Sequence, residues 1–105
     1  MSKLRYNEPA GTPRVGLITL VLRLPGCRSL KEKRSIIRPL LSHLAEDNLS
    51  VAEVGFADRR DFAVISCVAV SSSWGASQKR LERAAGIAAN TFGVDLMEEE
   101  TERLI

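Results

Sequence analysis

The chain has 105 residues, which corresponds to a single domain. Hydrophobic residues make up 45% of it and the formal net charge is +2. This composition excludes a disordered chain. No apolar run reaches the roughly 18–20 residues that a membrane-spanning helix needs, and the N-terminus lacks the apolar stretch of a signal peptide. We therefore expect a cytoplasmic protein.

Residues 1–14 contain Pro9, Gly11 and Pro13 without hydrophobic periodicity, which predicts a flexible N-terminal tail. The branched apolar run VGLITLVLRL at residues 15–24 predicts a strand in the middle of a sheet. Pro25 and Gly26 end this strand. A single folded domain is expected over residues 15–105.

A helix is expected next, from Ser29 to about Asp47. Ser29 and Glu32 have the spacing of a capping box, in which each side chain satisfies a free amide near the helix start. Pro39 removes an amide donor and crowds the preceding turn, so the helix is expected to bend and continue. The apolar residues that recur at helical spacing are Leu30, Ile37, Leu41 and Leu44.

Two further strands are expected at residues 49–56 and 61–70, joined by a hairpin turn with the sequence ADRRD. A second helix is predicted over residues 76–91, with Gly93 as a natural stop. Its apolar side comprises Leu81, Ala84, Ala85, Ala88 and, closing the stripe, Phe92. Residues 94–104 begin as a fourth strand, whose glutamates are expected to protect an exposed sheet edge.

The predicted order is therefore β-α-β-β-α-β, the ferredoxin-like arrangement of the α+β class. Right-handed crossovers place both helices on one face of a four-stranded antiparallel sheet, with the first and third strands in the middle.

The segment LPGCRSLKEKR at residues 24–34, followed by SVAEVG at residues 50–55, resembles the YlxP-like family of bacterial proteins of unknown function. The resemblance covers roughly residues 15–104, and SLKEKR is its most distinctive part; Pro39 and the N-terminal tail depart from the family pattern. It implies a ferredoxin-like fold and brings no established catalytic residue. Family members are often encoded near translation and ribosome-maturation factors, which implies an RNA-related context.

Charge is unevenly distributed. Residues 95–105 carry five acidic side chains against Arg103, a local net charge of −4, which leaves +6 for the rest of the chain. A basic body with an acidic end can attract polyanions, although charge runs also simply keep a surface hydrated.

The predicted topology gathers the basic residues at one end. Strand one ends where helix one begins, and strand two runs parallel to strand one, so the hairpin after strand two lies at that same end. The residues expected on this basic rim, or along the adjoining flank of the helix, are Arg28, Lys31, Arg34, Arg38, Arg59 and Arg60. A helix start attracts phosphate, and basic residues three and four apart suit successive phosphates of an RNA backbone. The alternative, that these side chains are only solvated, stays open.

Catalysis is not predicted. Cys27 is the one candidate nucleophile, because it lies beside Arg28 at a helix start, but His43 is expected on the outer side of that helix and no base lies within reach. Cys27 and Cys67 match no metal-ligand spacing and no secreted disulfide framework. The acidic residues 98–102 alternate between the two faces of a strand, which disfavours a metal site. We expect a non-enzymatic binding protein without a metal or cofactor.

Base stacking on the sheet is also disfavoured, because the first strand has no aromatic residue and the third has only Phe62. Trp74 is expected in a turn, where it covers the core beneath the second helix. RNA is therefore expected to bind through its backbone and shape.

Successive side chains of a strand point to opposite faces of the sheet, and in the two central strands the side chains of both faces are mainly apolar. One of these two apolar sets must therefore face away from the helices. One set comprises Leu17, Val21, Val64 and Val68, and the other comprises Ile18, Leu20, Leu22, Ile65 and Cys67. Monomers rarely expose a large apolar patch, so a homodimer or a docked protein is expected to cover it. This motivates an alternative function, a dimeric protein-interaction or small-ligand regulatory module whose basic residues are only solvating.

Overall fold

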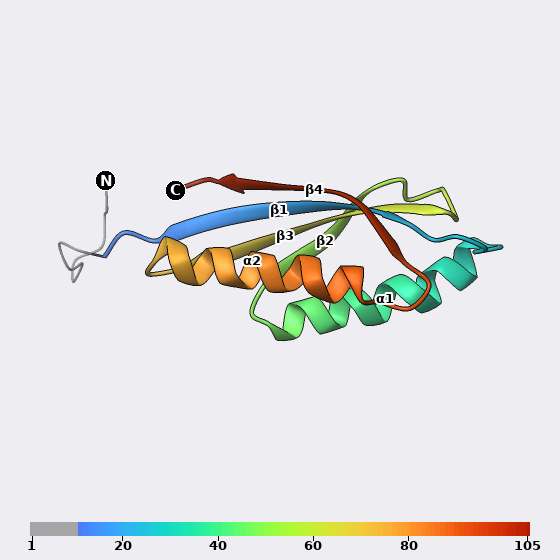
Figure 1. The fold of residues 1–105 in the computed structure, drawn as a ribbon, viewed down its shortest axis with the longest axis horizontal. Coiled ribbons are helices and arrows are strands. Elements are labelled where there is room, and N and C mark those ends of the chain that lie inside the picture. Colours follow the sequence, from blue (N-terminus) through green and yellow to red (C-terminus); the bar gives the residue numbers. More distant parts are fainter. Residues whose placement is uncertain (1–10) are drawn as a thin grey trace.

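The computed structural model describes residues 11–105 (Figure 1). The elements follow in the order β1 (Arg14–Arg23), α1 (Leu30–Glu46), β2 (Ser50–Gly55), β3 (Phe62–Ser71), α2 (Trp74–Ala89) and β4 (Asp95–Arg103). The strands form one antiparallel sheet in the order β2-β3-β1-β4, and both helices lie on the same side of it (Figure 1). This ferredoxin-like α+β fold confirms the predicted one. Most of the predicted tail lies outside the described residues, and Arg14 already belongs to β1.

The two central strands explain the apolar runs in the sequence. Burial alternates along both, because one set of side chains packs under the helices and the other faces away. The helix-side set of β1 and β3 includes Ile18, Leu20, Leu22, Ala63, Ile65, Cys67 and Ala69, each at most 2% exposed. Burial raises the pKa of the Cys67 thiol to about 11, so this cysteine acts as a small hydrophobic side chain.

The start of α1 follows half of the predicted capping box. The Ser29 side chain accepts a hydrogen bond from the Glu32 amide at 3.1 Å, as expected. The Glu32 carboxylate, however, accepts from the amide of Arg28 at 3.4 Å, one residue before the predicted donor. The helix continues through Pro39 to Glu46, so the prediction of one continuous helix is confirmed.

The buried stripe of α1 differs from the predicted one. Its buried residues are Lys33, Ile37, Leu40 and Leu44, spaced four, three and four apart. Leu30 is 37% exposed and Leu41 is only partly buried, because the inner face of the helix is rotated away from both. Leu30 was therefore wrongly placed on the buried stripe, whereas Leu41 packs against the edge of the core.

Phe92 was also wrongly assigned, since it is 98% exposed. Helix α2 ends at Ala89, two residues before the predicted end, and the chain then turns through Gly93, whose φ of 82° suits glycine. This turn points Phe92 outward, and Val94, 7% exposed, joins the core instead.

Helix α2 approaches β1 closely at Gly16. A methyl group there would lie 2.8 Å from Leu81 Cδ1 and 2.8 Å from Trp74 Cζ3. We expect Gly16→Ala to lower the free energy of unfolding by about 1–3 kcal/mol, because the packed neighbours must move. A methyl group at Gly86 in α2 would have no atom within 4 Å apart from the adjacent residues and backbone of its own helix. Gly86→Ala should therefore raise the free energy of unfolding by up to about 1 kcal/mol, because alanine favours the helix more than glycine does. Urea unfolding measures both, and equal stability of the two variants would contradict this packing.

Candidate functional site

The start of α1 and the β2–β3 loop meet at one end of the sheet, which confirms the predicted placement. A hollow of about 590 Å³ is lined by residues of both segments, Arg28 from the turn before α1 and Arg60 from the loop. A neighbouring hollow of about 450 Å³ is lined by Arg28, Arg59 and Arg60 together with Asp58 and Asp61. Stretches some thirty residues apart in the chain therefore form one basic rim.

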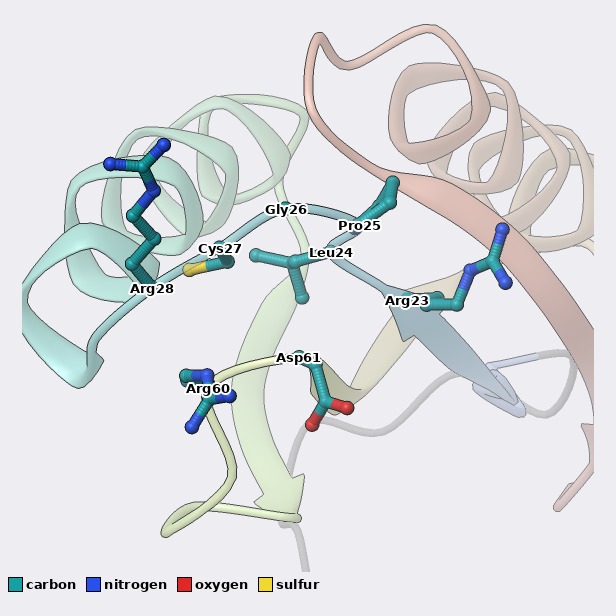
Figure 2. Close-up of a pocket in the computed structure, with 8 residues that line it drawn as sticks. All are labelled: Arg23, Leu24, Pro25, Gly26, Cys27, Arg28, Arg60 and Asp61. Carbon is teal, nitrogen blue, oxygen red and sulfur yellow. The ribbon is translucent and has the colours of Figure 1, made fainter.

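Figure 2 shows how the residues of the first hollow are arranged. Arg28 and Arg60 flank it from opposite segments, and the guanidinium group of Arg28 points away from Arg60 (Figure 2). Arg23, which also lines this hollow at the C-terminal end of β1, donates a hydrogen bond to Asp95 at 3.0 Å. The arginines thus fan out along an open rim and do not converge on one point, which suits an extended anion better than a small one.

Arg59 is held by its own loop. Its guanidinium donates two hydrogen bonds of 3.0 Å to the carboxylate of Asp61 and lies 4.8 Å from the ring centre of Phe62 and 5.6 Å from that of Phe56. The hydrogen bond from Arg59 lowers the pKa of Asp61, and the same bond raises the pKa of Arg59. An anion that binds Arg59 must therefore compete with Asp61.

Arg28 and Arg60 differ from Arg59 in this respect. Within residues 11–105, neither guanidinium group has an ion pair or a side-chain hydrogen bond to a carboxylate, and both residues are exposed. These two arginines are the cations of the rim that are free to contact a ligand.

The other predicted site residues lie elsewhere. Arg34 and Arg38 line a separate groove between α1 and β2, together with Glu53 and Ala57. Lys31 is exposed in the first turn of α1 and lines neither hollow of the rim. The six predicted residues therefore do not form one continuous site.

Lys33 was missed by sequence reasoning, although it organises this end of the molecule. It is only 2% exposed, and its ammonium group donates to the carbonyl oxygens of Phe56 at 2.8 Å and Arg59 at 2.7 Å. It also forms an ion pair of 2.9 Å with the carboxylate of Glu53 in β2. The signal was present in the sequence, because position 33 lies on the same helical face as Ile37.

These bonds fix the shape of the β2–β3 loop. Phe56 has a φ of 56°, a left-handed conformation that is unfavourable for an aromatic residue. Its carbonyl accepts from Lys33 and also from the Arg59 amide at 2.9 Å, which closes a turn. Lys33 thus sets the position from which Arg59 and Arg60 extend.

The model of a family described as protein of unknown function (DUF503) matches residues 15–101. The chain belongs to this family. No protein with a curated description matches the sequence. The match to the DUF503 family spans the basic rim, Lys33 and the β2–β3 loop, and the family description assigns no activity to any of them.

The nucleophile considered for this DUF503 protein is enclosed. Cys27 is 8% exposed, and its thiol donates to the carbonyl of Ser29 at 3.5 Å. His43 is exposed on α1 and lines a different depression, with Asp47 and Arg83 of α2. Across residues 11–105, no three His, Cys, Asp or Glu residues form a group that could hold a metal ion. None of the helices within these residues is long and apolar enough to cross a lipid bilayer.

Proposed function

We propose that this DUF503 protein is a non-enzymatic, cytoplasmic protein that binds structured RNA or a ribosomal particle through the basic rim. The observation that carries the proposal is the meeting of Arg28 and Arg60, both exposed and without a carboxylate partner in the described chain, beside the start of α1. The free amides of a helix start add to the attraction for phosphate.

The rim favours a nucleic-acid backbone over a single small anion. Its hollows are broad, and its free arginines lie on two segments and point in different directions (Figure 2). Base stacking has little support, because the Phe62 ring is occupied by Arg59 and the Trp74 ring has Arg103 above it at 5.1 Å. Backbone contacts of this kind position a protein on RNA without reading its sequence.

The resemblance to the YlxP-like family gives independent support for an RNA partner, since it implies a place among translation and ribosome-maturation factors. A filter-binding titration against an RNA hairpin and against ribosomal subunits, at about 50 and 200 mM salt, tests the proposal. Binding that weakens steeply with salt is the expected result. Failure to bind either at low salt would remove the proposal.

A second candidate function, a dimeric interaction module, rests on the sheet face that points away from the helices. The apolar residues there are Val15, Leu17, Val21, Val64, Val68 and Val70, of which Val70 is 53% exposed. Thr19 and Ser66 interrupt them with a hydrogen bond of 2.9 Å between their hydroxyl groups. We propose that a second copy of the chain covers this face.

The edge strand β4 limits how two such faces can pack. Register places Glu98, Glu100 and Glu102 opposite Val21, Thr19 and Leu17, so these three glutamates form a column on the same face. In a face-to-face dimer the twofold axis lies in the plane between the two sheets. If this axis is perpendicular to the strands, the two glutamate columns stack against each other. An axis parallel to the strands instead places β1 over β3 of the second copy, and each glutamate column over β2.

Cysteine cross-linking distinguishes these arrangements. Ser50, Val68, Leu17 and Glu102 lie in one row across the sheet. With the parallel axis, we expect a short bismaleimide to join Ser50→Cys of one copy to Glu102→Cys of the other, since packed sheets lie about 10 Å apart. A Glu100→Cys protein that links only to itself would indicate the perpendicular axis. A monomer by light scattering at high concentration would exclude both.

A further inference from the structure

The groove between α1 and β2 has an uncovered apolar floor. It has a volume of about 250 Å³ and is lined by one face of α1 and by Ala57 on the loop side. The apolar residues of α1 that reach solvent there are Leu30 and Leu41, on either side of the buried Ile37. Leu30 is 37% exposed and Leu41 is only partly buried. The groove therefore offers apolar surface that the described chain leaves open to solvent.

Some charged residues of the groove are paired with each other and others are not. Lys33 is paired with Glu53 at its base, so these two charges compensate each other. Arg34 and Arg38 are exposed on its rim, and the described part of the chain supplies no carboxylate partner for either. A ligand that complements this groove carries an acidic group close to an apolar one.

In the sheet that residues 11–105 form, the strand beside the groove is a free edge. β2 is the last strand of the order β2-β3-β1-β4, and half of the backbone amide and carbonyl groups of such an edge point away from the sheet. The opposite edge, β4, carries the glutamate column, which discourages further strands. β2 has Glu53 as its one charged residue, and that carboxylate is bonded to Lys33. The edge is regular over residues 50–53, before an irregularity in register between Glu53 and Gly55.

We propose that β2 and this groove bind an extended acidic peptide segment of a partner protein. The segment pairs with β2 as a fifth strand, in the manner of β-strand addition. Every second side chain of an added strand points toward α1. The segment therefore presents an apolar residue to Leu41 and an acidic residue, two positions along, to Arg34 and Arg38, which lie in the preceding two turns of α1. This inference does not rest on the RNA proposal, because Arg28 and Arg60 belong to a different surface.

A set of fluorescein-labelled peptides in a Ser/Thr background tests the inference by fluorescence anisotropy. The set follows Ser-Thr-Leu-Thr-Glu-Thr-Ser, with Leu exchanged for Ile, Val, Phe or Met and Glu for Asp. Matched controls carry the acidic residue directly after the apolar residue, as in Ser-Thr-Leu-Glu-Thr-Thr-Ser. In an added strand this acidic side chain would point to the sheet face opposite α1. Further controls carry N-methyl groups on alternate amides, which block strand pairing on one edge. The protein is used as the full chain.

We expect at least one peptide of the set to bind saturably below about 1 mM. Its matched control and its N-methylated form should bind at least tenfold more weakly. Arg34→Glu combined with Arg38→Glu should also weaken binding at least tenfold, whereas Arg28→Glu combined with Arg60→Glu should leave it unchanged. Urea unfolding of each variant verifies that both surface substitutions leave the fold intact.

Two results overturn the inference. One is the absence of binding by every peptide of the set to the natural protein. The other is equal binding of a peptide and its matched control, which would show that alternation along a strand plays no part. If the Arg34→Glu, Arg38→Glu protein loses RNA affinity and no peptide binds, the groove belongs to the RNA surface.

Discussion

Lys33→Met is expected to lower the free energy of unfolding by about 2–4 kcal/mol. Methionine keeps most of the length of the lysine side chain but removes the hydrogen-bond donor to the Phe56 and Arg59 carbonyls and the partner of Glu53. Only the lysine side of the ion pair is fully enclosed, since the side chain of Lys33 is 3% exposed and that of Glu53 is 26% exposed. Most of the cost therefore comes from the two carbonyl oxygens that lose their donor, and a smaller part from the unpaired carboxylate. Urea unfolding measures the change.

Lys31→Met is the matched control, since Lys31 lies two residues earlier in α1 and is exposed. It should change stability by less than about 0.5 kcal/mol. Adding Glu53→Leu to Lys33→Met should recover part of the loss, because no charge is then left unpaired. If Lys33→Met were as harmless as Lys31→Met, the role of Lys33 in holding the loop would be wrong.

The combined substitution Arg28→Glu and Arg60→Glu should weaken RNA binding by about 10–100-fold at low salt. It removes both cations of the basic rim that have no carboxylate partner within residues 11–105 and replaces them with charges that repel phosphate. The salt dependence should become shallower by about two units of slope, one for each lost phosphate contact. The same filter-binding titration measures affinity and slope, and an unchanged affinity contradicts the assignment of the rim.

Asp61→Asn should change RNA affinity in the opposite direction to the two arginine substitutions. The substitution removes the negative charge and one of the two oxygen acceptors that hold Arg59 at 3.0 Å, so RNA affinity is expected to rise. The low pKa of Asp61 means that its pairing with Arg59 persists at neutral pH, where the assay is made. Stabilisation from this pair is present above the ordinary aspartate pKa of 3.8 and is lost as the pH falls through the lowered value of the folded state. A fall in affinity would mean that the loop shape matters more than its free charge.

The order of elements and the shared end of the rim could be predicted from the sequence, because both follow from periodicity and chain direction. The apolar run at residues 15–24 and the helical pattern at residues 76–91 left few alternatives for the topology. Strand direction alone then placed Arg60 beside Arg28, without any knowledge of side-chain contacts.

The partners of individual charges could not be predicted in the same way. Arg59 and Arg60 are adjacent and look equivalent in the sequence, yet Arg59 is bonded to Asp61 and Arg60 has no carboxylate partner in the described chain. Which of them pairs depends on the turn at Phe56, and that turn depends on Lys33. The errors at Leu30 and Phe92 have a similar origin, since a shift of one or two residues at a helix end changes which side chains are buried.

The central position of β1 has a consequence for synthesis of the chain. β1 pairs with β3 on one side and β4 on the other, and the carbonyl of Val15 accepts from the amides of Leu104 and Ile105. During synthesis β1 therefore waits for β4, which lies some seventy residues later in the chain, before its second edge is paired. A nascent chain halted before Asp95 would expose one whole edge of β1, and such an intermediate is a natural substrate for chaperones.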